Sequence, residues 1–419
     1  MLKKLSLIIK KNVSLQITKF YIEVMYSKKI NHNKIIFISL LFLFVINSVF
    51  AQLTEKAQIS VLTCGSGSEL FESFGHTAIR ICDTSQGIDI VYNYGIFDFN
   101  TEFFYLKFAQ GKLSYMLAAS SFNAFMQEYA YYGRAVYEQV LNFTTQEKQT
   151  FFHLIEENYK PENRYYQYDF FLDNCATRVR DIVSNSLENR SFPPSCTTKT
   201  DYSFRELFLP YTQNFLWWRF GIDIALGSVA DRKTSVWDCM YLPNDLMTQL
   251  DTTILTHSIS SLVESKTTLL EETKVQSYPT LISPNMVFWL LLLLIVLLTF
   301  TEWKRKKYVE WIDIILFFLV GLISLLVMYL WFISDHSATK GNWNILWANP
   351  LFFYVLFRLR KTQYIVLQIL TACLLLFLLG FGFLPQHFNT AFIPISLMLM
   401  VRILMLIYRK KFHHANKGL

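Results

Sequence analysis

The sequence predicts an α+β domain outside the cytoplasm, followed by an all-α bundle of about five transmembrane helices. Three observations lead to this prediction. Residues 1–51 have the pattern of an export leader, residues 52–283 mix strand-like and helical segments, and residues 284–419 contain five apolar runs. Hydrophobic residues make up 53% of the 419-residue chain, which is more than in most soluble proteins. We therefore expect a leader, an exported domain and a transmembrane domain with these bounds.

The leader has the parts of a signal peptide. A Lys-rich stretch precedes an apolar run at 35–46, and the segment 48–51 ends on the small residue Ala51. Gln52 follows, where a lipoprotein signal would need a Cys, so we expect ordinary cleavage after Ala51. An uncleaved N-terminal anchor is the alternative.

The charge distribution argues against a nucleic-acid partner. The chain has a formal net charge of +7, but the lysines of the leader supply about all of it, and residues 52–283 are acidic. Proteins that bind a phosphate backbone present a basic face on their soluble domain. We therefore expect no nucleic-acid binding.

The apolar runs predict the membrane topology. They cover residues 286–300, 312–333, 345–357, 364–384 and 392–408. The third run is shorter than the roughly 20 residues that a span needs. We still count it, because five spans place the basic clusters at 304–307, 358–361 and 409–411 together in the cytoplasm. The soluble domain then lies outside the cytoplasm, and the C-terminus is cytoplasmic.

The exported domain shows both secondary-structure patterns. Strand-like stretches lie at 59–62, 76–82 and 88–94. A mostly helical stretch covers 102–159, with a helix start at 144–147. Apolar residues then follow Cys175 at helical spacing, at positions 179, 182, 183 and 187. The spacing places Cys175 at or near the first turn of a helix.

Cys175 and His76 form the candidate catalytic pair. Backbone N–H groups and the dipole at a helix start stabilise a thiolate, and Asp173 or Asn174 as N-cap would fix Cys175 there. A nucleophilic thiol also needs a base, and His76 opens a predicted strand just after Gly75. A Cys on a helix start with a His on a strand is the papain-like arrangement, here in circularly permuted order.

The roles of the neighbouring residues remain open at this point. A third group usually orients such a histidine, and Asn93 and Asp98 are the candidates. The pair itself has a structural alternative, because a helical Cys is often a small buried hydrophobe. Cys64 and Cys82 are rival thiols, although no helix start lies beside them.

The cysteines and histidines predict neither a metal site nor a cofactor. No C-x-x-C or H-x-x-x-H pair is present, so the spacing does not suit zinc. Five cysteines lie in the exported domain, and an odd number leaves at least one thiol free. Cys196 and Cys239 are an open possibility for a disulfide.

Several longer motifs resemble one family. They lie at 70–80, 92–99, 168–178 and 221–227, with a membrane-domain part at 334–337 and 342–350. Together they resemble the Lnb lipoprotein N-acyltransferases. The resemblance implies a circularly permuted papain-like domain in the periplasm, related to the NlpC/P60 group. This domain is joined to a helical domain in the cytoplasmic membrane of a Gram-negative bacterium. It also implies that Cys175 and His76 move an acyl chain, through a Cys thioester, from a phospholipid to the N-terminal amine of a diacylated lipoprotein.

Both implied substrates are lipids, so we expect some residues of this chain to meet the bilayer. His336, Asn342 and Asn344 in an outward loop, and Arg402 within the last apolar run, are candidates for head-group contacts. Aromatic residues at 103–105, 108, 217 and 218 are candidates for an interfacial surface. The alternative function is a membrane-tethered NlpC/P60-like cysteine hydrolase of peptidoglycan peptides or amides. A non-catalytic scaffold is a third possibility.

Overall fold

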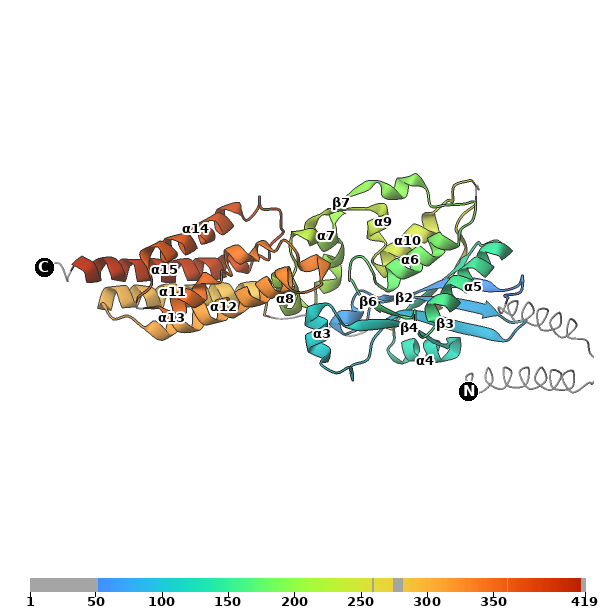
Figure 1. Ribbon diagram of the computed structural model, residues 1–419, viewed down its shortest axis with the longest axis horizontal. Helices are drawn as coiled ribbons and strands as arrows, with labels where there is room; N and C mark the ends of the chain where they lie inside the picture. Colours follow the sequence, from blue (N-terminus) through green and yellow to red (C-terminus); the bar gives the residue numbers. More distant parts are fainter. Residues whose placement is uncertain (1–51, 258–259, 274–281, 360, 416–419) are drawn as a thin grey trace, which may run out of the picture. The chain divides into compact units, whose positions relative to one another are not determined.

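The computed structural model describes residues 52–257, 260–273, 282–359 and 361–415, and the predicted signal peptide lies outside them. The described chain has a mixed α/β part followed by a helical part (Figure 1). Its main sheet has seven antiparallel strands in the order β6-β4-β3-β2-β1-β5-β9. The strands are β1 (Gln58–Cys64), β2 (His76–Asp83), β3 (Ile88–Ile96), β4 (Ser114–Ser121), β5 (Val136–Leu141), β6 (Tyr165–Gln167) and β9 (Val263–Leu270). A small second sheet pairs β7 (Lys199–Ser203) with β8 (Lys233–Ser235).

The sheet is covered by helices on both faces, and its middle strand is buried. Six of the seven β1 residues are buried, which explains why this strand carries so many apolar side chains. The larger core lies under α5, α6 and α10, and α4 covers the opposite face (Figure 1). The α helices before the membrane part are α3 (Phe104–Gln110), α4 (Phe122–Tyr131), α5 (Thr145–Tyr159), α6 (Cys175–Ser186), α7 (Phe204–Phe208), α8 (Leu216–Ala225), α9 (Val236–Cys239) and α10 (Pro243–Thr252).

The start of α5 confirms one prediction in detail. Thr144 is the N-cap, its hydroxyl accepts the Glu147 N–H at 3.2 Å, and Glu147 accepts the Thr144 N–H at 2.9 Å. These contacts form a capping box, which satisfies two backbone N–H groups at the helix start. The helix ends at Tyr159, just before Lys160 and Pro161, as the proline requires.

All five apolar runs form helices, and three of these are long enough to cross a membrane. The membrane part contains α11 (Pro284–Arg305), α12 (Glu310–Phe332), α13 (Leu351–Phe357), α14 (Tyr364–Gly380) and α15 (Phe392–Ala415). The three candidate spans are α11, α12 and α15, whereas α14 has 17 residues and α13 has seven. A seven-residue helix rises only about 10 Å. Five spans therefore remain a prediction.

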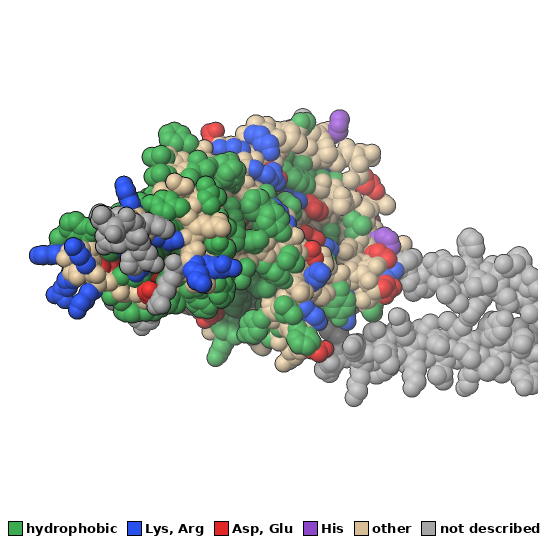
Figure 2. Space-filling view, turned by 60° about the vertical axis from the view of Figure 1, so that its left-hand side comes forward, with side chains coloured by type: hydrophobic (Ala, Val, Ile, Leu, Met, Phe, Trp, Pro, Cys, Tyr) green, Lys and Arg blue, Asp and Glu red, His purple; other side chains and the backbone are tan. Residues whose placement is uncertain are grey.

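Hydrophobic side chains cover much of the outer face of these helices, and Lys and Arg side chains gather at one end (Figure 2). The basic residues at 304–307, which follow the apolar stretch of α11, are all exposed. Deeper in the bundle, the buried Arg402 on α15 pairs with Glu302 at 2.7 Å and with Asp313 at 2.6 Å. This buried triad joins the three longest helices.

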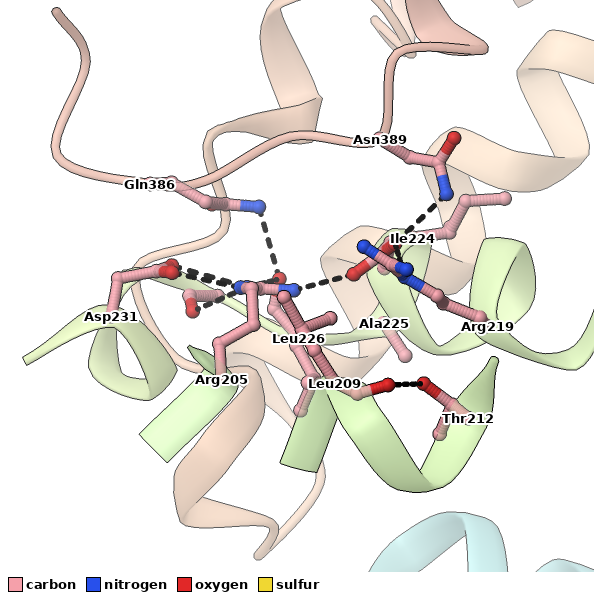
Figure 3. Close-up of polar contacts among 12 residues, drawn as sticks. Arg205, Leu209, Thr212, Arg219, Ile224, Ala225, Leu226, Asp231, Gln386 and Asn389 are labelled. Atoms are coloured by element: carbon pink, nitrogen blue, oxygen red, sulfur yellow. Dashed lines mark hydrogen bonds and ion pairs between the residues drawn. The ribbon is translucent and has the colours of Figure 1, made fainter. Parts of the chain in front are cut away.

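Buried polar contacts join the α/β part to the membrane helices (Figure 3). The Arg205 guanidinium on α7 pairs with Asp223 and Asp231, each at 2.8 Å. The second Asp223 oxygen accepts a hydrogen bond from Asn389, which lies just before α15, at 2.9 Å. Gln386 of the same loop donates to the Leu226 carbonyl at 3.0 Å. The two parts therefore share one polar network.

Candidate active site

Cys175 is the first residue of α6, and the sequence around it fixes the helix start. Asn174 is the N-cap, and its Oδ1 accepts the backbone N–H groups of Ala176 and Thr177 at 2.8 and 2.9 Å. The Asn174 N–H donates to the Thr177 hydroxyl at 2.7 Å, which completes a capping box. The sequence allowed either Asp173 or Asn174 as the N-cap, and in the structure the N-cap is Asn174.

His76 is the first residue of β2 and lies opposite Cys64 of β1. The preceding Gly75 has a φ of +77°, and a Cβ there would lie 2.6 Å from the Cys64 carbonyl oxygen. Only glycine fits this conformation. The turn places His76 at the beginning of β2. Its Nε2 lies 3.2 Å from Asn93 Oδ1 on β3. An amide oxygen only accepts hydrogen bonds, so Nε2 carries the proton and Nδ1 is free of one, as a base requires.

The start of α6 packs against β2 and β3, and this packing brings Cys175 to the His76 end of the sheet. The backbone N–H of Thr77, the residue after His76, acts on the Cys175 thiol and favours its ionised form. The pairing of β3 with β4 shifts between Asn93 and Ile96. Gly95 lies in this irregularity with a φ of +89°, and a Cβ there would be 3.9 Å from Cys175 Cβ. Such bulges often occur beside functional sites.

Burial keeps both candidate catalytic groups neutral. It raises the pKa of the Cys175 thiol above its usual 9.0, although the N–H groups of Thr77 and Ala176 act in the opposite direction. Burial also lowers the pKa of His76 to about 4, against the effect of the Asn93 hydrogen bond. From the helix start we expected a stabilised thiolate. Loss of hydration outweighs the helix start here, so the resting pair is a thiol beside a neutral imidazole.

The structure separates the two residues proposed to orient His76. Asn93 contacts the imidazole, whereas Asp98 is exposed and its Oδ1 accepts the N–H of Asn100 at 2.8 Å. Asp98 therefore caps a local turn.

The rival thiols lie in different surroundings. Cys64 is buried in β1, and burial raises its pKa to about 12. Cys82 lies near the opposite end of β2 from His76 and pairs with Gln58. All cysteines of the described residues are free thiols, including Cys196 and Cys239, so the possible disulfide between them is not formed.

The four candidate head-group residues make contacts within the protein. Asn342 and Asn344 are fully buried, and their amides donate to backbone carbonyls of α8, including Ile224 at 2.8 and 3.2 Å. His336 Nε2 donates to the Phe108 carbonyl at 2.7 Å. Arg402 is fully buried in its triad of charged residues. Contact of these residues with lipid head groups remains a prediction.

Asp169 belongs to the surroundings of the candidate site, although the sequence did not point to it. Its backbone pairs with that of Asp173 at 2.9 and 3.0 Å, which closes the loop before Cys175. Its carboxylate accepts the Phe171 N–H at 3.0 Å and the hydroxyl of Ser337, which follows α12. An Asp at the start of a short loop is a pattern that predicts a turn. No sequence pattern predicts its distant partner Ser337.

No group of three His, Cys, Asp or Glu side chains in the described ranges could hold a metal ion. A cavity of about 370 Å³ lies where the α/β part meets the loop before α15. It is lined by Ser203, Glu206, Asp231, Lys233 and residues 381, 382 and 384–388. None of the candidate catalytic residues lines it.

Comparison with known protein families gives two matches. Residues 52–202 match the Lnb N-terminal periplasmic domain, and residues 276–412 match the Lnb transmembrane domain. Together the two models cover most of the chain after the leader. No curated protein and no solved structure matches it.

Proposed function

Because the chain belongs to the Lnb family, we propose that it is a lipoprotein N-acyltransferase. It moves an acyl chain from a membrane phospholipid to the α-amine of an S-diacylglyceryl-cysteine at a lipoprotein N-terminus. The observation that carries the proposal is the His76–Asn93 contact beside Cys175 at the start of a helix. The chain is a membrane protein with a periplasmic domain, so both lipid substrates are within its reach.

The first half-reaction forms an acyl-enzyme. His76 Nδ1 accepts the thiol proton as Cys175 Sγ attacks the carbonyl carbon of the phospholipid ester. The carbon–oxygen bond breaks, and the leaving alkoxide takes the proton from His76 to give a lysophospholipid. A neutral imidazole with its proton on Nε2 supports this role, because a base must begin with one unprotonated ring nitrogen.

The second half-reaction transfers the acyl chain to the lipoprotein. The amine nitrogen attacks the thioester carbonyl, the carbon–sulfur bond breaks, and His76 carries the amine proton to the sulfur. Each tetrahedral intermediate needs donors for its oxyanion. The Cys175 N–H is one candidate. The Tyr166 hydroxyl is a second, because it has no hydrogen-bond partner among the described residues and lies 3.9 Å from the Cβ position of Gly95, as Cys175 Cβ does.

The membrane arrangement belongs to the same proposal. We place the catalytic domain, residues 52–283 in permuted papain-like form, in the periplasm and the bundle of residues 284–419 in the cytoplasmic membrane, with the C-terminus in the cytoplasm. The exposed basic residues at 304–307 support this orientation. Five spans require α13 and α14 to cross together with the three longer helices. A simple hydrolase would need one span as a tether, so a bundle favours lipid substrates.

Mass spectrometry of lipoprotein N-termini tests the proposed reaction. The host should lack any other N-acyltransferase and express the wild type, Cys175→Ala or, as a matched control, Cys82→Ala. We expect N-acylated lipoproteins from the wild type and from Cys82→Ala, and none from Cys175→Ala. Purified wild type mixed with phospholipid should also gain the mass of one acyl chain on Cys175.

Three results would contradict the proposal. N-acylation by Cys175→Ala would remove the thioester mechanism. Absence of N-acylation with normally folded wild type would remove the transferase activity. Cleavage of peptidoglycan peptides, or release of free fatty acid without transfer to the amine, would favour the hydrolase.

A further inference from the structure

Four aromatic side chains form a continuous row near Cys175. Tyr168 stacks on Tyr115 with ring centroids 4.6 Å apart, Tyr115 contacts Phe97 at 5.2 Å, and Phe97 contacts Phe104 at 5.8 Å. We call these four residues the aromatic row. All four are partly exposed, so the row lies at the surface and not in the core.

The inner end of the row lies beside the candidate nucleophile. The Cβ position of Gly95 is 3.9 Å from Tyr168 Cε2 and 3.9 Å from Cys175 Cβ, so the ring and the thiol-bearing residue flank the same glycine. The inner end of the row therefore lies close to the residue that carries the thiol.

The outer end of the row is the short helix α3. Phe104 begins this helix, and its neighbours form an exposed apolar surface that we call the α3 face. It consists of Phe103, Tyr105, Leu106 and Phe108, which are 67%, 81%, 53% and 51% exposed. Phe103 has a φ of 54°, a left-handed conformation that a non-glycine residue adopts at a cost.

Contacts with the end of α12 place the α3 face next to the membrane part. The Asp335 N–H donates to the Gln110 carbonyl at 2.8 Å, and His336 Nε2 donates to the Phe108 carbonyl at 2.7 Å. Just before these residues, Phe332 and Ile333 at the end of α12 are 65% and 67% exposed. The α3 face therefore continues the apolar surface of a candidate membrane span, at the end where the span leaves the bilayer.

We propose that the α3 face lies in the outer leaflet and that the aromatic row binds the acyl chain of a membrane lipid on its way to Cys175. This inference rests on the proposed acyl transfer and adds a binding site for the chain. Aromatic side chains suit both ends of such a path, because they make large apolar contacts and are stable at the membrane–water boundary. A row of rings also accepts an acyl chain at many positions along its length.

Acyl donors of different chain length separate binding of the acyl chain from the acylation step itself. The full-length protein is reconstituted in phosphatidylethanolamine vesicles, and acyl-Cys175 is followed by intact-mass spectrometry. The long-chain donor is the vesicle phospholipid, and the second donor is p-nitrophenyl butyrate, a water-soluble short-chain ester.

The variants are Tyr115→Ala in the row and Phe103→Gly in the α3 face. Phe103→Gly suits the left-handed backbone, so it removes the ring without adding strain. Tyr131→Ala, at an 84% exposed tyrosine on α4, is the matched control.

For both variants, we expect acylation from phospholipid to fall about tenfold, while acylation by the short ester stays within about twofold of the wild type. Tyr131→Ala should leave both rates unchanged. Equal losses with both donors, or no loss with either, would overturn the acyl-chain site. Loss of self-association in Phe103→Gly with an unchanged phospholipid rate would assign the α3 face to a second copy of the chain and also overturn it. If the wild type forms no acyl-Cys175 from either donor, the proposed acyl transfer itself fails.

Discussion

One hydrogen bond at His76 decides which ring nitrogen can act as a base. Asn93 Oδ1 lies 3.2 Å from Nε2 and can only accept, so the tautomer is fixed with Nδ1 unprotonated. With a pKa of about 4, His76 stays neutral through the physiological range. In the proposed mechanism the thiol needs no prior ionisation, because its proton moves to His76 as the bond to sulfur forms.

We expect Asn93→Ala to slow acylation of Cys175 at least about tenfold, because the imidazole loses the partner that fixes its tautomer. Asp98→Ala should have no effect, since Asp98 only caps its own turn. The pH–rate profile separates positioning from simple misfolding. The Asn93 hydrogen bond raises the pKa of His76, so its removal should move the acid limb, near pH 4 in the wild type, to lower pH. An unmoved limb with unchanged kcat would exclude Asn93 as the orienting residue.

Among the secondary-structure elements, the irregularity in β3 shapes the space beside the thiol. Between Asn93 and Ile96 the pairing with β4 shifts, and Gly95 turns the strand with a positive φ. Two polar groups near Gly95 belong to different strands: Asn93 lies on β3, and the Tyr166 hydroxyl lies on β6. Because Gly95 has no side chain, the space next to Cys175 Cβ stays open.

Gly95→Ala tests this interpretation. The new methyl group would lie in ordinary contact with Cys175 Cβ and would occupy the substrate's space, and the positive φ would add about 1–2 kcal/mol of strain. Gly87→Ala is the matched control, because Gly87 also has a positive φ and nothing within 4 Å of its Cβ position. We expect both variants to lose similar stability in thermal unfolding, but only Gly95→Ala to lose N-acylation. Equal activity of the two variants would contradict the role given to Gly95.

In the whole molecule, the loop before Cys175 and the membrane helices are parts of one hydrogen-bonded structure. Asp169 closes the loop before Cys175 and accepts the Ser337 hydroxyl from the segment after α12. The Arg205 network adds buried contacts with the loop before α15 (Figure 3). The helical bundle therefore contributes contacts that position the α/β part.

Arg205→Met should destabilise the full-length protein by about 3–5 kcal/mol, because it leaves the buried Asp223 without its closest cationic partner. Lys199→Met is the control. Lys199 pairs with Asp238 at 3.7 Å with its side chain 63% exposed, and such a surface pair contributes at most about 1 kcal/mol. Chemical unfolding in detergent, followed by tryptophan fluorescence, measures the difference. Equal effects of the two substitutions would show that the Arg205 network does not hold the two parts together.

The sequence by itself determined the class of each segment and the candidate nucleophile. The apolar runs predicted the membrane helices because a span needs a long unbroken stretch of apolar residues. The start of α5 could be predicted because a capping box is a local pattern of neighbouring residues. The helical spacing after Cys175 is also local, so it predicted the start of α6.

Only the tertiary structure decided the features that depend on contacts between distant residues. That Asn93 and not Asp98 contacts His76 depends on the register between β2 and β3, where Ala78 pairs with Asn93. The neutral state of the thiol depends on how much chain covers it, and burial opposes the local effect of the helix start. Partners such as Asp169 and Ser337 could not be predicted, because no local pattern in one segment specifies which distant segment it will meet.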